Sequence, residues 1–83
     1  MKNLKAYVER KNAWSKLFGS QPLVIGRDNQ KIADSLDCDL SPENLHCDGE
    51  ISAAQARAKY RALTAAAREL QQLDPSVKFY EFA

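Results

Sequence analysis

The stretch from Asp48 to Pro75, DGEISAAQARAKYRALTAAARELQQLDP, contains the start, the end and both faces of one long helix. Ser52 and Gln55 are spaced as in a capping box, in which the serine oxygen accepts from the third helical N–H and the glutamine side chain reaches back. Pro75 has no backbone donor and disfavours a helical conformation for the residue before it. We therefore predict a helix over residues 53–73, about 30 Å long at a rise of 1.5 Å per residue.

One face of this helix is apolar and rich in alanine. Spacings of three and four residues are typical of a helix face that packs against another element. The face consists of Ala53, Ala56, Tyr60, Leu63, Ala67 and Leu70. Because half of it is alanine, a second helix could approach it closely. The face is too short for a free-standing coiled coil, so we expect it to pack on the rest of the chain or on a partner.

The remainder of the long helix is basic. Its bases are Arg57, Lys59, Arg61 and Arg68, and its single acid is Glu69. None of the four bases has an acidic residue three or four positions away, so their counter-charges must come from outside the helix. These four residues are the candidate polyanion-binding surface.

A second helix is predicted over residues 3–18. Apolar residues recur on one of its sides with helical period, while charged residues take the rest. The apolar side consists of Leu4, Tyr7, Val8, Trp14, Leu17 and Phe18. Gly19 followed by Pro22 predicts the end of this helix, because glycine adopts the left-handed cap conformation and proline cannot continue a helix. We expect the apolar side to face the core rather than a membrane surface.

Shorter elements are predicted in the middle of the chain. Residues 23–25 form an apolar run that is either a buried linker or a short strand. Asp28 or Asn29 can cap a short helix over residues 30–36. The apolar side of that helix consists of Ile32, Ala33 and Leu36.

A further helical turn is predicted over residues 42–45, where Ser41 can cap and Pro42 takes the first helical position. The string KIADSL is similar to the first helix of a helix-turn-helix. The acidic residues that follow it would be repelled by phosphates, so we do not favour that fold.

The last residues, VKFYEF, form an aromatic tail that is either a short strand or extended chain. Three aromatic side chains in so short a stretch, Phe79, Tyr80 and Phe82, favour association if they are exposed. We therefore expect the tail to dock, either on its own domain or on a neighbouring molecule.

Length and charge exclude several classes of protein. With 83 residues the chain is one small domain. Residues 1–27 and 51–83 are net basic and residues 28–50 net acidic, and the total is only +1. We expect the acidic middle to neutralise the basic ends, which argues against a dedicated polyanion binder.

Two cysteines, no apolar run of membrane length and no signal peptide predict a cytoplasmic protein.

Metal and catalytic sites are weakly indicated. Residues 44–55 resemble an EF-hand loop at Asp48 and Gly49, but Gln55 stands where calcium requires a bidentate glutamate. Zinc accepts the side chains of cysteine and histidine, and the candidate ligands are Cys38, His46 and Cys47. Their spacing is not that of a zinc motif, so we expect neither metal nor cofactor. We also expect no enzyme, because no catalytic motif is present.

The sequence thus predicts an all-α domain with two longer helices, one or two short helical turns and an extended aromatic tail. We expect a non-catalytic protein-interaction or regulatory module that forms a homodimer. The residues expected to bind the partner are Tyr60, Leu63, Leu70, Phe79, Tyr80 and Phe82. The alternative is a nucleic-acid-associated accessory protein that uses the basic face of the long helix. A metal-binding protein or an enzyme comes third.

Overall fold

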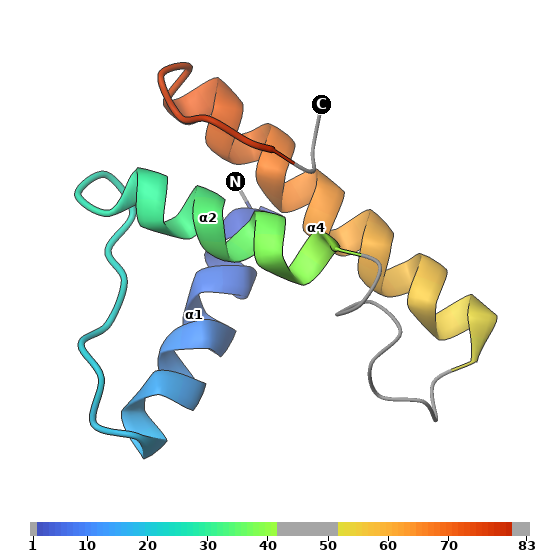
Figure 1. Ribbon diagram of the computed structural model, residues 1–83, viewed down its shortest axis with the longest axis horizontal. Helices are drawn as coiled ribbons and strands as arrows, with labels where there is room; N and C mark the ends of the chain where they lie inside the picture. The colour runs from blue at the N-terminus through green and yellow to red at the C-terminus, as the bar shows by residue number, and fades with distance from the viewer. Residues whose placement is uncertain (1, 42–51, 81–83) are drawn as a thin grey trace.

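The computed structural model describes residues 2–41 and 52–80, and the statements below refer to these residues. They form three helices, α1 (Lys2–Leu17), α2 (Asn29–Leu40) and α4 (Ala53–Leu73), and no strand. Figure 1 shows α1 leading away from α4, with α2 passing over the start of α1 and running beside α4. Both α1 and α2 pack on α4. The predicted all-α fold, with two long helices and a shorter one, is confirmed.

Helix α4 has the predicted length and the predicted caps. The hydroxyl of Ser52 accepts from the backbone nitrogen of Gln55 at 3.2 Å, and the Gln55 side chain accepts from the Ser52 nitrogen at 2.8 Å. At the other end Asp74 is extended, with φ −141° and ψ 91°, as a residue before proline prefers. Local signals therefore determine both ends of the longest helix.

The core lies where α2 and the start of α1 meet α4. Its fully buried large side chains are Leu4, Ile32, Leu36 and Leu70. Truncating one of these to alanine typically costs about 2–5 kcal/mol. The predicted apolar face of α4 is partly wrong, because Ala53 and Tyr60 are exposed while Ala66 is buried. Ala53 and Tyr60 lie in the half of α4 that extends away from its crossing with α1.

Glu69 holds α1 and α4 together where they cross. Its Oε1 accepts from the backbone nitrogens of Asn3 and Leu4, at 3.0 and 3.3 Å. The first N–H groups of a helix have no partner within the helix, and a carboxylate there also interacts favourably with the helix dipole. Burial acts to raise the pKa of Glu69, but the hydrogen bonds from Asn3 and Leu4 outweigh it and leave the pKa below its ordinary value. The N-terminus of α1 is therefore held against the C-terminal half of α4.

Helix α1 ends as predicted, at a glycine cap. Gly19 has φ +71°, and the nitrogens of Ser20 and Gly19 donate to the carbonyls of Ser15 and Lys16, at 3.0 and 3.3 Å. This pair of bonds is a Schellman motif, in which glycine adopts the left-handed conformation without a steric penalty.

Helix α2 is longer than predicted, because two of its aspartates have partners elsewhere in the fold. Asp37 accepts from the backbone nitrogen of Tyr80 at 2.8 Å, and Asp39 accepts from the hydroxyl of Tyr7 at 2.6 Å. The helix therefore continues through Asp37 and Asp39 to Leu40.

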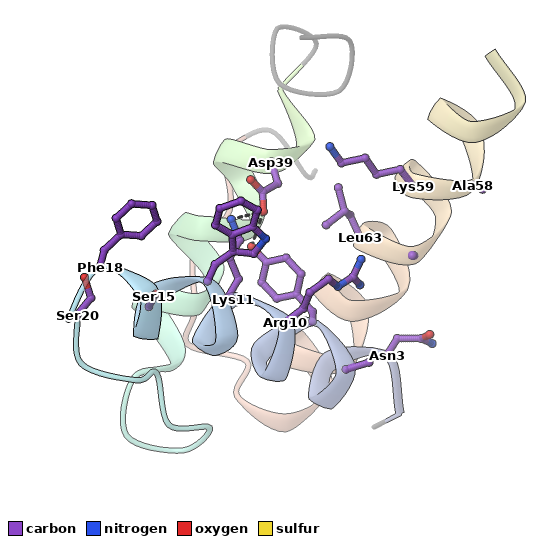
Figure 2. A pocket seen from close by; sticks show the side chains of 14 residues that line it. Asn3, Arg10, Lys11, Ser15, Phe18, Ser20, Asp39, Ala58, Lys59 and Leu63 are labelled. Atoms are coloured by element: carbon purple, nitrogen blue, oxygen red, sulfur yellow. Dashed lines mark hydrogen bonds and ion pairs between the residues drawn. The ribbon is translucent and has the colours of Figure 1, made fainter. Parts of the chain in front are cut away.

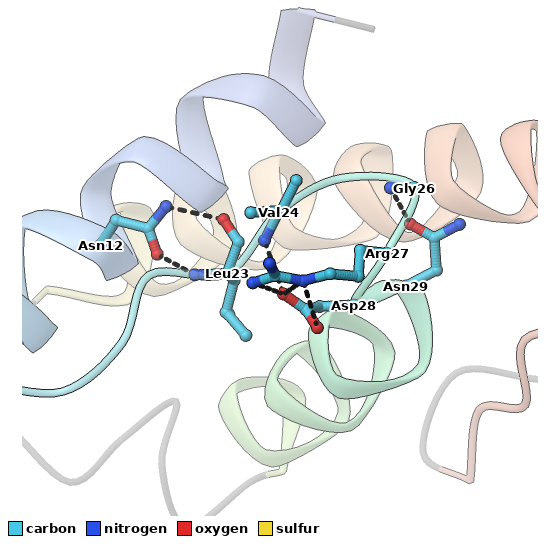
Figure 3. Close-up of polar contacts among 7 residues, drawn as sticks. All are labelled: Asn12, Leu23, Val24, Gly26, Arg27, Asp28 and Asn29. Carbon is cyan, nitrogen blue, oxygen red and sulfur yellow. Dashed lines mark hydrogen bonds and ion pairs between the residues drawn. The ribbon is translucent and has the colours of Figure 1, made fainter.

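The predicted side-chain cap of α2 is wrong. Asp28 occupies the N-cap position, but its side chain makes no cap hydrogen bond and instead accepts from the nitrogen of Val24 at 2.9 Å. The Asn29 side chain accepts from the nitrogen of Gly26 at 2.7 Å (Figure 3). Arg27 donates to Asp28 and thereby lowers its pKa. These side chains stabilise the turn before the helix rather than the first turn of the helix.

The run at residues 23–25 is a linker. The amide of Asn12 donates to the carbonyl of Leu23 at 2.9 Å and accepts from its nitrogen at 2.7 Å (Figure 3). Leu23 and Ile25 are half-buried against the core. The linker is thus attached to the middle of α1.

The described part of the tail is extended and docks on its own chain. Val77 is buried, and Phe79 packs against the core. The backbone of Lys78 binds the side chain of Gln30 at two points. Residues 76–80 therefore dock on their own chain. Phe82 and the predicted turn at residues 42–45 lie outside the described residues.

None of the helices in the described ranges is both long enough and apolar enough to cross a membrane.

Candidate functional site

A groove of about 940 Å³ lies between α1 and the N-terminal half of α4. It exists because the two helices meet at Glu69 and then diverge, as Figure 1 shows. Figure 2 shows Arg10 and Phe18 on the α1 side, with Ala58 and Lys59 on the α4 side. Its volume is near the upper end of the range for ligand pockets, about 300–1,000 Å³.

The α4 wall of the groove is built from small side chains. Ala58 and Ala62 line it, with Leu63 and Lys59 beside them, and Ala6 faces them from α1. Alanine provides apolar surface but fills little space, so bulky side chains fit between these walls.

Three large apolar side chains stand at the far end of α1, beside the groove. Trp14, Leu17 and Phe18 are 62, 76 and 74% exposed. The rings of Trp14 and Phe18 stack in parallel, with centroids 6.3 Å apart. We call Trp14, Leu17 and Phe18 the apolar end of α1. The expectation that these three residues face the core is wrong, because α4 has diverged from α1 by this point and only Leu4, Tyr7 and Val8 are buried.

The floor of the groove is a closed polar network. The hydroxyl of Tyr7 donates its single proton to Asp39. The hydroxyl of Ser35 lies 2.7 Å from the Tyr7 oxygen, so in that pair Ser35 is the donor and Tyr7 the acceptor. Burial, and then the hydrogen bond to Asp39, raise the pKa of Tyr7 above its ordinary value. Lys11 binds Asp39 at 2.9 Å and lies 5.7 Å from the centroid of the Tyr7 ring. The groups of this network therefore satisfy one another.

Two bases at the groove remain without an acid. In the described ranges no acidic side chain forms an ion pair with Arg10 or Lys59. Asp39, which lines the groove with them, is already bound by Lys11 and Tyr7. The groove is thus apolar on its walls and basic at its edge.

The structure disperses the residues expected to bind a partner. Leu63 and Leu70 are buried in the core, and Phe79 is half-buried against it. Tyr60 and Tyr80 are exposed but lie on different elements, and Phe82 lies outside the described residues. The described members of this set do not form one surface. The sequence signal that was missed is the pair Trp14 and Phe18, four residues apart and followed by uncharged chain.

The four candidate polyanion-binding bases do not share one face either. Arg57, Arg61 and Arg68 are exposed and follow one another along the side of α4 away from the core, at spacings of four and seven residues. Lys59 is half-buried and lines the groove on the opposite side. The acids of α2 that the structure describes do not neutralise the three arginines, since no ion pair to them is present in residues 2–41 and 52–80. We call Arg57, Arg61 and Arg68 the arginine stripe.

The candidate metal ligands are only partly described. Cys38 is exposed, whereas His46 and Cys47 lie outside the described residues, as does most of the loop similar to an EF-hand. In the part of the chain that is described, no three His, Cys, Asp or Glu side chains are arranged to hold a metal ion.

Comparisons of the chain with protein-family models, with curated proteins and with solved structures find no match. The geometry of the groove and its surroundings is therefore the basis for a functional proposal.

Proposed function

We propose that this chain is a small, non-catalytic protein-interaction module, and that its contact surface is the apolar end of α1 together with the α1–α4 groove. The observation that carries the proposal is the exposure of Trp14, Leu17 and Phe18 beside a groove with apolar walls. Contiguous exposed apolar side chains mark interaction sites, and aromatic residues are enriched at the centres of protein interfaces.

The floor of the groove supports a contact surface rather than a reaction site. Tyr7, Ser35, Asp39 and Lys11 bind one another, and such mutual bonds suit a network that stabilises the fold. Burial and the hydrogen bond to Asp39 raise the pKa of Tyr7, which makes its hydroxyl a weaker acid than that of an exposed tyrosine.

Self-association and a cytoplasmic location belong to the same proposal. A protein of this size gains stability by covering its exposed apolar surface. A reducing compartment suits Cys38, whose side chain is exposed and would be open to oxidation elsewhere.

Site-specific photo-crosslinking in cells tests the proposal. A benzophenone-bearing amino acid at Leu17 should form covalent adducts with protein, while the same group at the exposed Lys31 on α2 should form few. Equal yields at the two positions would overturn the proposal, because the apolar end of α1 would then be no more a contact surface than the face of α2.

A nucleic-acid-associated accessory protein is the second candidate, and the arginine stripe is the observation that favours it. Three exposed guanidinium groups without acidic partners in residues 2–41 and 52–80 could contact phosphates. We rank this candidate second because the net charge is only +1, whereas nucleic-acid-binding domains are usually strongly basic.

A further inference from the structure

We infer that the partner in the groove is a second copy of this chain, and that the apolar end of α1 of each copy inserts into the α1–α4 groove of the other. The inference rests on the proposed function, for which it names the partner and the geometry.

Shape is the first argument. Exposed Trp14 and Phe18 line the α1 side of a groove whose opposite wall includes Ala58 and Ala62. Large side chains that face small ones interdigitate without strain. The aromatic pair leaves its own groove open, because the two rings stack on each other and remain more than half exposed. The same molecule therefore carries both a protruding group and a cavity that fits such a group.

Symmetry is the second argument. When a protruding group and its receptor lie side by side on one molecule, a two-fold axis allows two copies to exchange them reciprocally. Such an interface closes after two copies, so it gives a dimer and not a filament. The inferred contact is of this isologous kind.

Charge is the third argument. The ten residues from Leu17 to Gly26 include no charged side chain. This segment can approach Arg10 and Lys59 of another copy without like-charge repulsion. Lys16 lies between Trp14 and Phe18 in sequence, but at 3.6 residues per turn it points to the other side of α1. The uncharged segment is thus compatible with a basic groove.

Size is the fourth argument. A buried Trp or Phe contributes about 150–250 Å² of contact surface. Two reciprocal insertions, each with Trp14, Phe18 and Leu17 against the walls of a groove, approach the lower end of stable interfaces, about 1,200 Å² in total. We expect a dimer that dissociates in the micromolar range.

Sedimentation equilibrium across micromolar concentrations tests the inference with two kinds of variant. Phe18→Ser removes an exposed protruding group, and Ala62→Phe fills the groove from an exposed position on α4. The wild type should approach twice its chain mass of 9.3 kDa, while either variant alone should remain monomeric. Leu73→Ser is the matched control, since Leu73 is an exposed apolar residue at the other end of α4 that does not line the groove, and it should dimerise like the wild type.

Mixing the two variants distinguishes reciprocal insertion from other dimers. Phe18→Ser retains an open groove and Ala62→Phe retains its aromatic pair, so the mixture can form one of the two insertions. Dimer should reappear in the mixture at the highest concentrations, with weaker affinity than in the wild type. A mixture that behaves as its components do alone would overturn the reciprocal geometry. Circular dichroism of each variant verifies that it is folded.

Failure of this inference differs from failure of the proposed function. If the wild type stays monomeric but Leu17 crosslinks to another protein in cells, the groove has a different protein partner. The inference and the proposed self-association then fail, while the proposed protein-interaction surface stands. Trp14 is the only tryptophan and reports directly on the groove. A change in its fluorescence on addition of a single-stranded oligonucleotide, together with a monomeric wild type and no adducts at Leu17, would overturn both.

Discussion

The side-chain amide of Gln30 accepts a hydrogen bond from the backbone nitrogen of Lys78 at 3.0 Å and donates one to its carbonyl oxygen at 3.1 Å. The amide thus pairs with an extended backbone as a neighbouring β-strand would. This contact joins α2 to the tail over 48 positions of sequence and holds Val77 against the core.

Replacement of Gln30 by alanine should loosen the tail. Both hydrogen bonds are lost, and at about 0.5–1.5 kcal/mol each we expect the free energy of unfolding to fall by about 1–3 kcal/mol. Urea denaturation measures the change, and limited proteolysis of the folded variant should cut near Lys78 more rapidly. Gln21→Ala, at an exposed position between α1 and the linker, is the control. Identical midpoints for the two variants would show that Val77, Phe79 and the hydrogen bond from Tyr80 to Asp37 hold the tail without Gln30.

Loss of the capping box should destabilise α4 from its start. Ser52→Ala removes the acceptor for the nitrogen of Gln55, and such cap removals typically cost about 1 kcal/mol. Gln55→Ala should cost less, because the serine oxygen still binds the helix. The urea midpoint of each variant gives the values. Ser20→Ala serves as the control, and a midpoint for Ser52→Ala equal to that of the control would contradict the role of the cap.

Acid should release the turn between α4 and the tail. Asp74 accepts from the hydroxyl and the nitrogen of Ser76 and from the side chain of Asn29, and these bonds, the Ser76 hydroxyl first, lower its pKa. A carboxylate whose pKa is lowered on folding stabilises the fold fully at a pH above its ordinary pKa, which is 3.8 for this group. The stabilisation is lost as the pH falls through the lower pKa of the folded state.

Thermal unfolding by circular dichroism over the acidic range tests the role of Asp74. Asp74→Asn should be less stable than the wild type at neutral pH, and its stability should decrease less on acidification, because a titrating group has been removed. Glu9→Gln, at an exposed position on α1, controls for net charge. The prediction fails if the Asp74 and Glu9 variants show the same dependence on pH.

Nucleic-acid binding by the arginine stripe should be weak. If Arg57, Arg61 and Arg68 each contact one phosphate of duplex DNA, log affinity should fall by about 2.7 per log unit of salt, from about 0.9 per contact. We expect affinity weaker than about 1 μM even at low salt, because only three contacts and a net charge of +1 support it. Fluorescence titration of a labelled duplex at two salt concentrations measures both quantities.

Arg61→Gln is the informative variant for this titration, and Lys5→Gln, an exposed base on α1, is its control. Sub-micromolar binding at low salt that is lost in Arg61→Gln but retained in Lys5→Gln would promote the nucleic-acid function above the protein-interaction function.

The parts of the fold that the sequence predicts are those determined by neighbouring residues. The capping box, the proline stop of α4 and the glycine cap of α1 each involve groups within about one or two helical turns of one another. The length of α2 was not predictable in this way, because the partners of Asp37 and Asp39 are Tyr80 and Tyr7, which are distant in sequence.

The candidate site was harder to predict, because periodicity identifies the apolar side of a helix but not how far another element covers it. Leu4 and Trp14 belong to the same predicted side of α1, yet one is fully buried and the other is mostly exposed. The difference arises from the angle between α1 and α4, which Glu69 and the core determine together. The same limitation explains why Leu63 and Leu70, expected at an interface, lie in the core.

The two hydrogen bonds between Asn12 and Leu23 have a practical consequence for engineering. They hold Leu23, at the far end of the loop that follows α1, against that helix, so additional residues within the loop need not alter the packing of the helices. Because the entropy of loop closure grows only slowly with length, the exposed bond between Ser20 and Gln21 should accept an inserted peptide. A short epitope inserted there would sit at the edge of the groove, where an antibody fragment could block or report its occupation while both termini remain unmodified.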